Sequence, residues 1–230
     1  MKFNPRQIFS ENKGFLFFVA AMILMRSALA DWYVVPSGSM YPHLMEGDRV
    51  IANRIAYDIR VPFTDIILKQ VADPQRGDIV TFISPEDGKR LVKRVMGLPG
   101  DVLEMVDEQL IINGVKAEYD RVKNPDTTML IPQREYTQEQ IVLTERFGSF
   151  QHNIIITPDR QAVRNFGPYT IPPGHYMMFG DNRDNSNDSR FIGFIKREAI
   201  TGRVKHLMFS LDYDNYYLPR LERIGAKVGS

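Results

Sequence analysis

Two serines separated by one glycine are the residues of this chain best suited to nucleophilic chemistry. In Pro36-Ser37-Gly38-Ser39, proline fixes one backbone dihedral and glycine permits unusual ones, so a tight, exposed turn is expected. Such a turn can present a hydroxyl and aim a backbone N–H at the same point. A polar linker would have the same composition, so these serines predict catalysis only if a base activates one of them.

The most obvious base is His43, which follows Ser39 closely in the sequence. The chain has four histidines, and none lies in a GxSxG or HExxH motif. A catalytic histidine reaches its serine through the fold, so closeness in sequence is weak support for it. We interpret His43 as a turn residue rather than a base.

A neutral lysine is the other side chain that can activate a serine. It must be buried among apolar groups, because desolvation penalises the ammonium form and lowers the lysine pKa. In RLVKRVMGLPGD (90–101), strand periodicity places Lys93 on one face with Leu91 and Val95, and Arg94 on the opposite face. Lys93 is therefore the candidate base. The alternative is a lysine that protects an edge strand from aggregation.

A third polar stretch, GDNRDNSNDSR (180–190), is rich in charged and hydrogen-bonding side chains. It is not a calcium loop, because Arg183 occupies a position that needs an oxygen ligand. A solvated loop is the alternative to a network that holds one hydroxyl in place. In that network we expect aspartates to pair with arginines: Asp181, Asp184 and Asp188 with Arg94, Arg183 or Arg190.

The composition is that of a globular protein with one sizeable domain. The 230 residues are 43% hydrophobic and 25% charged, with a net charge of +1. This balance argues against a nucleic-acid partner, so none is expected. The absence of cysteine excludes disulfides, thiolate metal sites and a cysteine nucleophile. We expect no cofactor and no metal.

The N-terminal region contains the most apolar stretch, GFLFFVAAMILM (14–25), after a basic segment at 1–13. A cleavable signal peptide is one interpretation, with ALA at 28–30 as its cleavage site. A retained membrane anchor over 14–35 is the other, although its uncharged core is short for a bilayer span. Both place the basic end in the cytoplasm and export the rest of the chain.

The remainder predicts a mostly β fold, with an antiparallel sheet of short strands at 36–230. Residues 117–170 are more polar and less periodic, and predict a smaller inserted β subdomain. The C-terminal tail predicts a surface edge with a frayed end. Apolar and β-branched runs between turn signals predict strands at 49–55, 78–83, 90–96, 109–113, 175–179 and 201–211.

Taken together, these stretches resemble bacterial type I signal peptidase (leader peptidase), a membrane-bound serine–lysine endopeptidase family. The resemblance runs from about Val35 to Leu211 and keeps five blocks in the family's order. One departure is His43, where the family often has threonine, and it argues against an essential role for that histidine. The blocks are PSGSM (36–40), GDRVIANRIAY (47–57), RGDIVTF (76–82), KRVMGLPGD (93–101) and GDNRDNSNDSR (180–190).

The resemblance implies specific roles for the candidate residues. Ser39 would be the nucleophile and Lys93 its general base. The Ser37 hydroxyl would form an oxyanion hole with the Ser39 N–H, and Ser186 would orient the Lys93 amine by a hydrogen bond. It also implies two supporting pairs in the loop: Asp188 with Arg190, and Arg94 with Asp181.

The implied activity is removal of N-terminal signal peptides from exported preproteins. The implied fold has two antiparallel β regions, the smaller one inserted at 117–170, behind one N-terminal anchor helix at 14–35. Preprotein signal peptides and membrane lipid would be its partners, and we expect a monomer. It would sit in the inner (cytoplasmic) membrane as a single-pass protein with its catalytic domain on the extracytoplasmic, periplasmic side.

One alternative is a serine–lysine peptidase dedicated to a single pilus or conjugation substrate. A self-cleaving repressor would instead need a DNA-binding N-terminus.

Overall fold

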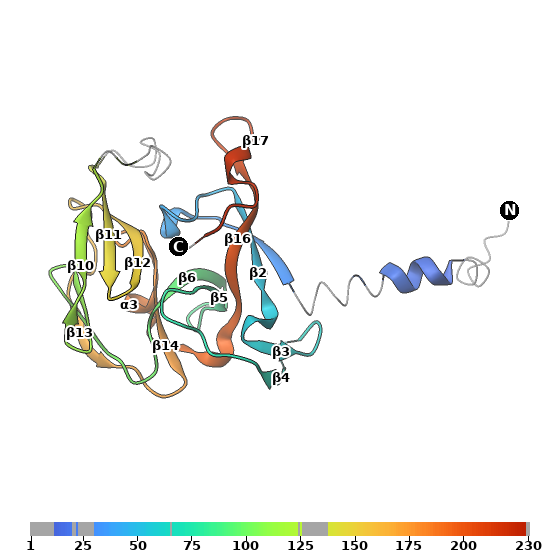
Figure 1. The fold of residues 1–230 in the computed structure, drawn as a ribbon, viewed down its shortest axis with the longest axis horizontal. Helices are drawn as coiled ribbons and strands as arrows, with labels where there is room; N and C mark the ends of the chain where they lie inside the picture. Colours follow the sequence, from blue (N-terminus) through green and yellow to red (C-terminus); the bar gives the residue numbers. More distant parts are fainter. Residues whose placement is uncertain are drawn as a thin grey trace.

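The fold is mostly β, as the sequence predicts (Figure 1). It is known from a computed structural model, which describes residues 12–19, 22, 30–64, 66–123, 125 and 138–228. Each of the six segments predicted as strands contains a strand of the structure, within a residue or two at most ends.

The largest element is an antiparallel eight-stranded sheet with the order β1-β2-β16-β5-β6-β14-β15, in which β17 pairs with β16. Side-chain alternation explains its formation: in β2, Asp48, Val50 and Ala52 are buried and the residues between them are not. Its strands are β1 (Ala30–Val34), β2 (Asp48–Asn53), β5 (Ile79–Ile83), β6 (Arg90–Gly97), β14 (His175–Phe179), β15 (Ile195–Lys196), β16 (Ile200–Asp212) and β17 (Leu218–Pro219).

This sheet curls until its first strand faces β6. The long strand β16 pairs with both β2 and β5, and register shifts interrupt both ladders. Such bulges bend a strand and increase its twist. As a result, the Arg90 guanidinium of β6 lies 4.5 Å from the centre of the Tyr33 ring of β1, although three strands separate β1 from β6 in the sheet order.

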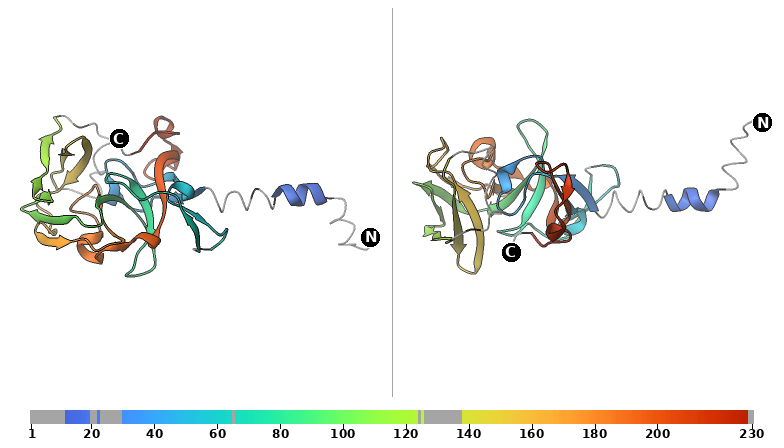
Figure 2. Two further views of the ribbon diagram at one scale, coloured as in Figure 1. Left: turned by 60° about the horizontal axis from the view of Figure 1, so that its bottom comes forward. Right: turned by 90° about the horizontal axis from the view of Figure 1, so that it is seen from above.

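A second β region lies beside the curled sheet (Figure 2). It consists of a three-stranded sheet, β10-β11-β12, and a four-stranded sheet, β13-β7-β8-β9. Strands are therefore present where the sequence predicts an inserted β subdomain, whose boundaries stay a prediction. The strands are β7 (Val102–Val106), β8 (Gln109–Ile112), β9 (Val115–Lys116), β10 (Glu118–Arg121), β11 (Ile141–Phe147), β12 (Phe150–Ile156) and β13 (Phe166–Thr170).

Short elements complete the described chain. A two-stranded hairpin, β3–β4, projects from the side of the molecule on which β1 begins (Figures 1 and 2). The bounds are η1 (Gly38–Met40), η2 (Arg54–Ala56), β3 (Asp58–Arg60), β4 (Ile67–Gln70), α3 (Ser189–Ile192), η4 (Arg197–Ala199) and η5 (Leu221–Arg223).

The predicted anchor at 14–35 needs one correction. Residues 30–34 form β1 and pair with β2, for example Tyr33 with Val50, so a helix continuing to Val35 is wrong. The β-branched and aromatic residues of this stretch gain more from the sheet ladder than from a helix. Residues 13–19 are helical, and no helix within the described residues is long and apolar enough to cross a membrane. Most of residues 20–29 lie outside the described part.

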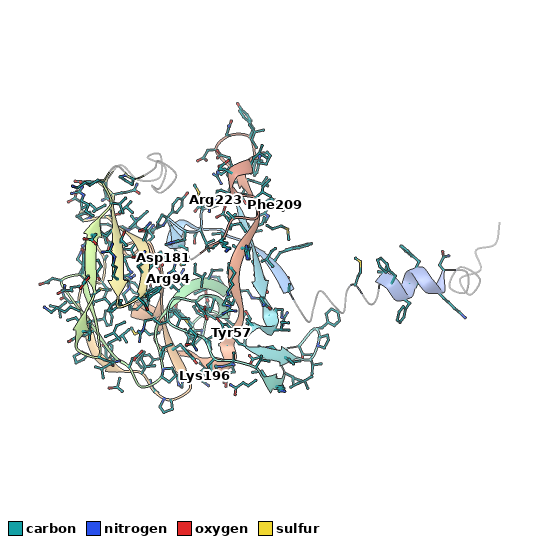
Figure 3. All side chains as sticks on the ribbon, in the orientation of Figure 1. Tyr57, Arg94, Asp181, Lys196, Phe209 and Arg223 are labelled. Carbon is teal, nitrogen blue, oxygen red and sulfur yellow. The ribbon has the colours of Figure 1, made fainter. Side chains whose placement is uncertain are left out.

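The described C-terminal tail lies at the surface, as expected, but it is fastened to the sheet rather than frayed. Arg223 binds both carboxylate oxygens of the buried Asp48, at 3.0 and 2.6 Å, and donates to the His43 carbonyl at 3.1 Å. Arg220 donates to the Glu46 carbonyl at 3.0 Å. Figure 3 shows Arg223 beside β16, where the tail returns to the sheet. These charge-assisted bonds fasten the tail to the segment that follows the serine turn.

Candidate active site

The Pro-Ser-Gly-Ser stretch forms the turn that leads into the short helix η1. Ser37 takes the N-cap position, yet its hydroxyl makes no capping hydrogen bond. The turn is held from outside by Asn182, whose side-chain amide donates to the Gly38 carbonyl at 3.0 Å and whose N–H donates to the Ser39 carbonyl at 3.1 Å. Ser39 is half-buried and Ser37 is exposed, so both hydroxyls are accessible to a substrate.

Lys93 lies directly against this turn. Its Nζ is 2.5 Å from Ser39 Oγ, although the two residues are 54 positions apart in the chain. The strand that carries it, β6, lies between β5 and β14 in the sheet. On the β14 side β6 is unpaired at Lys93, but the side chain is only 3% exposed, so the interpretation of Lys93 as a lysine that protects an exposed strand edge is wrong.

The surroundings of Lys93 favour its neutral form. The residue is only 3% exposed, and this burial lowers the pKa of its amine from 10.5 to about 8. The Asp188 and Asp181 carboxylates oppose the shift, whereas the Arg190 guanidinium adds to it. About a tenth of the Lys93 amine is therefore neutral and able to act as a base at pH 7, far more than for an ordinary lysine.

The loop at 180–190 closes over the back of the serine turn. Gly180 is required there, because a Cβ would lie 2.5 Å from the Ser39 carbonyl oxygen and 2.2 Å from Ser186 Oγ. Ser186 is 8% exposed, and the partner nearest to its hydroxyl is the Asp188 carboxylate rather than the Lys93 amine. The structure thus brings Ser186 to the back of the turn but does not form the hydrogen bond to Lys93 that the resemblance implies.

Two of the expected ion pairs in this loop are present. Arg94 binds both carboxylate oxygens of Asp181, at 2.8 and 2.7 Å, and both side chains are at most 1% exposed. Figure 3 shows this pair where the two β regions meet. Burial alone would raise the Asp181 pKa, but Arg94 holds it well below its ordinary value. Arg190 likewise pairs with the buried Asp188, with a shortest distance of 2.8 Å.

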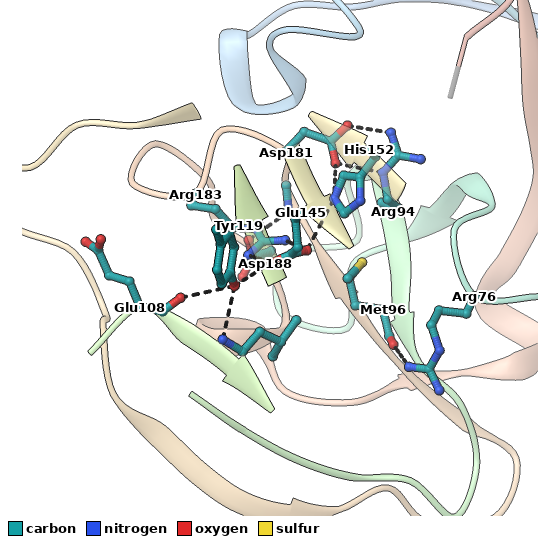
Figure 4. Close-up of polar contacts among 12 residues, drawn as sticks. Arg76, Arg94, Met96, Glu108, Tyr119, Glu145, His152, Asp181, Arg183 and Asp188 are labelled. Atoms are coloured by element: carbon teal, nitrogen blue, oxygen red, sulfur yellow. Dashed lines mark hydrogen bonds and ion pairs between the residues drawn. The ribbon is translucent and has the colours of Figure 1, made fainter. Parts of the chain in front are cut away.

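The other two loop residues bind partners that the sequence did not indicate. Arg183 pairs with Glu145 of β11, at 2.8 and 2.5 Å, and Asp184 accepts a hydrogen bond from the Thr157 N–H at 2.7 Å. Glu145 also accepts from the Tyr119 hydroxyl at 2.7 Å (Figure 4). These contacts tie the loop to the second β region across long sequence separations, which no sequence motif signals.

The two histidines near the site are not placed to act on Ser39. The His43 Nδ1 atom lies 2.9 Å from Asp181 Oδ2, and this contact directs the ring toward the buried ion pair. His152 is 3% exposed, and burial, helped by Arg94, lowers its pKa to about 3. His152 is therefore neutral between Glu145 and Asp181, at 3.5 and 3.6 Å (Figure 4).

Ser39 and Lys93 open onto a groove of about 170 Å³. One wall continues β1 into the serine turn, and the other is the first half of β6. Within the described chain, a larger cavity of about 200 Å³ lies elsewhere, next to Arg183, and includes neither Ser39 nor Lys93. The lining of the Ser39 groove is Tyr33, Val34, Val35, Pro36, Ser37, Ser39, Met40, Arg90, Leu91, Val92 and Lys93.

Comparison with known proteins places the chain in a family. Residues 10–209 match the family model described as signal peptidase, peptidase S26. Signal peptidase I of Pseudomonas fluorescens is 35% identical, with 97% of this chain and 81% of that protein covered. Signal peptidase I of Pseudomonas aeruginosa is 34% identical, with coverages of 98% and 81%. The crystal structure of a signal peptidase I from Enterococcus faecalis V583 superposes with a TM-score of 0.35 at 30% identity, over 58% of this chain and 98% of that one. The chain belongs to the signal peptidase family, peptidase S26, and is a peptidase.

Proposed function

We propose that this chain removes N-terminal signal peptides from exported preproteins, with Ser39 as nucleophile and Lys93 as general base. The observation that carries the proposal is the 2.5 Å approach of Lys93 Nζ to Ser39 Oγ at the end of an open groove. Relatives that carry the name signal peptidase I support the substrate class. No feature of the described residues favours a peptidase dedicated to a single pilus or conjugation substrate.

In the first step the neutral Lys93 amine accepts the Ser39 proton as Oγ attacks the carbonyl carbon of the scissile bond. The negative charge that develops on the carbonyl oxygen needs donors already in position. The Ser39 N–H is available for this, because the first N–H groups of a helix have no intrahelical acceptor. The Ser37 hydroxyl, which makes no capping hydrogen bond, is the second donor.

In the second step the Lys93 ammonium gives its proton to the leaving amine, and the acyl-enzyme remains on Ser39. A water molecule then attacks the ester and loses a proton to neutral Lys93, which returns that proton to Ser39 Oγ. Ser186, Asp188 and Arg190 act as supports, because they keep the loop packed behind the serine turn.

Substrate binding is supported by two strand edges that face the groove. β1 is the edge strand of the sheet and pairs only with β2. In β6, residues 90–93 pair with β5 on one side, whereas β14 pairs only from Arg94 onward. An extended peptide can lie between these edges and bond to their backbone, as in strand addition. Small apolar side chains fit the lining near the serine, which includes Val35, Met40 and Val92.

The proposal is tested by incubating the purified full-length protein with a preprotein in detergent and sequencing the new N-terminus of the product. Wild type is expected to cut at the signal-peptide junction, and Lys93→Ala is expected not to cut. Cleavage by Lys93→Ala at the wild-type rate would contradict the serine–lysine mechanism.

The rate of cleavage is expected to depend on pH through Lys93. Only the neutral amine is a base, so with a pKa of about 8 the value of kcat/KM falls about tenfold per pH unit below that pKa and levels off above it. A pH–rate profile measured between pH 5 and pH 10, roughly two to three units either side of the pKa, checks this. A profile that stays flat through the acid side would exclude a lysine base.

The lowered pKa of Lys93 also affects the free energy of unfolding, so stability measurements check the pKa independently of activity. A lysine whose folded-state pKa lies below 10.5 destabilises the folded state wherever the unfolded lysine is charged. Wild-type stability is therefore expected to rise between pH 8 and pH 10.5, across the interval between the two pKa values. In Lys93→Met this rise is absent, and the protein is more stable than wild type at neutral pH. A difference of 2.5 pH units corresponds to about 3 kcal/mol.

We also propose that the chain works as a monomer at the inner (cytoplasmic) membrane, with its catalytic domain on the extracytoplasmic side. Support comes from apolar side chains that face solvent on the β3–β4 hairpin: Phe63, Ile66 and Leu68 are 66%, 62% and 65% exposed. Exposed apolar groups gathered on one projecting element indicate contact with lipid or another apolar surface. The hairpin projects from the side on which β1 leaves the apolar N-terminal region (Figure 1).

Trp32 allows this contact to be measured, because it is the one tryptophan in the sequence and is 51% exposed in β1. In vesicles with bromine-labelled lipid chains, we expect quenching of Trp32 fluorescence in the full-length protein. Replacing Phe63, Ile66 and Leu68 by serine is expected to weaken the quenching, whereas Val106→Ser, at an exposed site in the second β region, leaves it unchanged. Equal quenching in wild type and in both variants would show that the hairpin does not contact the membrane.

A further inference from the structure

One end of the Ser39 groove carries an arginine held over a tyrosine ring. Arg90 begins β6, and its guanidinium carbon lies 4.5 Å from the centre of the Tyr33 ring on the opposite wall. The Tyr33 hydroxyl donates to Asp31 Oδ2 at 2.8 Å, which fixes the ring. A cation over an aromatic face is attracted to it, and the planar guanidinium also stacks on the ring. The charge of Arg90 is therefore held at the groove.

The described lining contains no carboxylate, although Asp31 lies just outside it, at the Tyr33 hydroxyl. The lining contains two basic residues, Arg90 and Lys93, and no acidic one. Lys93 is neutral when it acts as a base, so Arg90 then supplies the full positive charge of the groove wall. Among the described residues, its guanidinium contacts the Tyr33 ring and has no ion-pair partner. Its hydrogen-bond donors are available to a substrate.

Arg90 lies at a defined distance from the reacting carbonyl. It precedes Lys93 by three residues on one strand, which corresponds to about 10 Å. An extended peptide whose scissile carbonyl meets Ser39 therefore reaches Arg90 with the residue about four positions away. This end of the groove is formed by β1, which follows the apolar N-terminal region. The part of a substrate on that side is the part upstream of the scissile bond, because its own apolar segment lies there.

We infer that Arg90 selects substrates by the charge of the residue about four positions before the scissile bond. Acidic side chains are favoured there and basic ones are disfavoured. This inference rests on the proposed signal-peptide cleavage and deepens it. Because Arg90 is exposed, the expected preference is modest, about two- to fivefold in kcat/KM between glutamate and lysine. It weakens as salt concentration rises.

The test uses three synthetic peptides that span a signal-peptide cleavage site and carry Glu, Gln or Lys at that position. Cleavage is measured with the full-length protein in neutral detergent at low salt. Wild type is expected to rank them Glu, Gln, Lys, and Arg90→Gln is expected to treat them alike. Arg90→Glu is expected to reverse the order. The matched control is Lys89→Gln, which removes one positive charge from the residue next to Arg90. The Lys89 side chain pairs with Asp87 at 2.8 Å and lies outside the groove.

Three outcomes would overturn the inference and leave the proposed function intact. The first is cleavage of all three peptides by wild type at equal rates. The second is a preference that persists in Arg90→Gln. The third is a preference that disappears equally in Lys89→Gln, which would assign it to general surface charge. Failure of the proposed function looks different, because wild type would then cut the Gln peptide no faster than Ser39→Ala does.

Discussion

Ser39→Ala is expected to abolish cleavage of a preprotein while the protein stays folded. The substitution removes the attacking oxygen, and loss of a serine nucleophile typically lowers kcat by about 10⁶-fold. Lys93→Met removes the proposed base, which lies 2.5 Å from that oxygen, and is expected to lower kcat by about 10²- to 10⁴-fold. Because the two groups act as a unit, the double variant is expected to be no slower than Ser39→Ala. Single-turnover kinetics with circular dichroism as the folding check measures all three.

Two further variants separate this dyad from its neighbours. Ser37→Ala removes one proposed oxyanion donor, so kcat is expected to fall about 10²- to 10³-fold with little change in KM. His43→Ala is the control and is expected to remain largely active, because His43 faces Asp181 rather than Ser39. If His43→Ala were inactive and Lys93→Met active, His43 rather than Lys93 would be the base.

Asp181→Asn is expected to be among the most destabilising single substitutions in this protein. It leaves the Arg94 guanidinium, which is 0% exposed, without a countercharge. Breaking one partner of a buried ion pair typically costs about 3–5 kcal/mol of unfolding free energy. Because the Asp181 pKa is held well below its ordinary value, the pair's contribution is also expected to decline progressively as pH falls below about 4, where the unfolded carboxyl begins to take up a proton that the folded pair excludes. Urea unfolding of the wild type and variant at neutral and acidic pH measures both effects.

The control for this prediction is an exposed pair of the same charge type. Asp87→Asn breaks the contact with Lys89 and is expected to leave stability unchanged, because solvent screens both groups. The double variant Arg94→Met, Asp181→Leu removes both charges, and is expected to recover much of the loss. If Asp181→Asn were as stable as Asp87→Asn, the Arg94–Asp181 pair would not be a structural anchor.

The sequence predicted the strands and the loop that carry the candidate site, but it did not predict most of the long-range contacts that hold them together. Strand periodicity placed Lys93 on an apolar face, and its 3% exposure confirms that the residue is buried. The Arg94–Asp181 and Arg190–Asp188 pairs were expected and are present. The bond from Asn182 to the Ser39 carbonyl was not predicted, nor was the pairing of Arg183 with Glu145. Local pattern does not report such contacts, because they join segments that only the fold brings together.

Residues 30–35 are a segment for which the sequence predicted the wrong secondary structure. Hydropathy alone joined them to the apolar stretch before them, whereas in the structure residues 30–34 form β1. A strand needs a partner, and the partner β2 begins at Asp48, beyond the serine turn. The C-terminal tail was misjudged for the same reason, since Arg223 is anchored by Asp48, which lies far away in the sequence. Long-range pairing decided both outcomes.

By itself the sequence determined the mostly β class and the family resemblance, because residue types and their periodicity are local properties. The resemblance in turn implied Ser39 as nucleophile and Lys93 as base. Only the tertiary structure decided that Lys93 Nζ reaches Ser39 Oγ and that burial lowers the lysine pKa to about 8. It also placed Arg90 over Tyr33 at the end of the groove. These features depend on the curl of the sheet, which brings β1 opposite β6 and leaves Lys93 only 3% exposed beside the groove between them. Desolvation and distance are properties of the folded chain, and they make two serines and a lysine a candidate site.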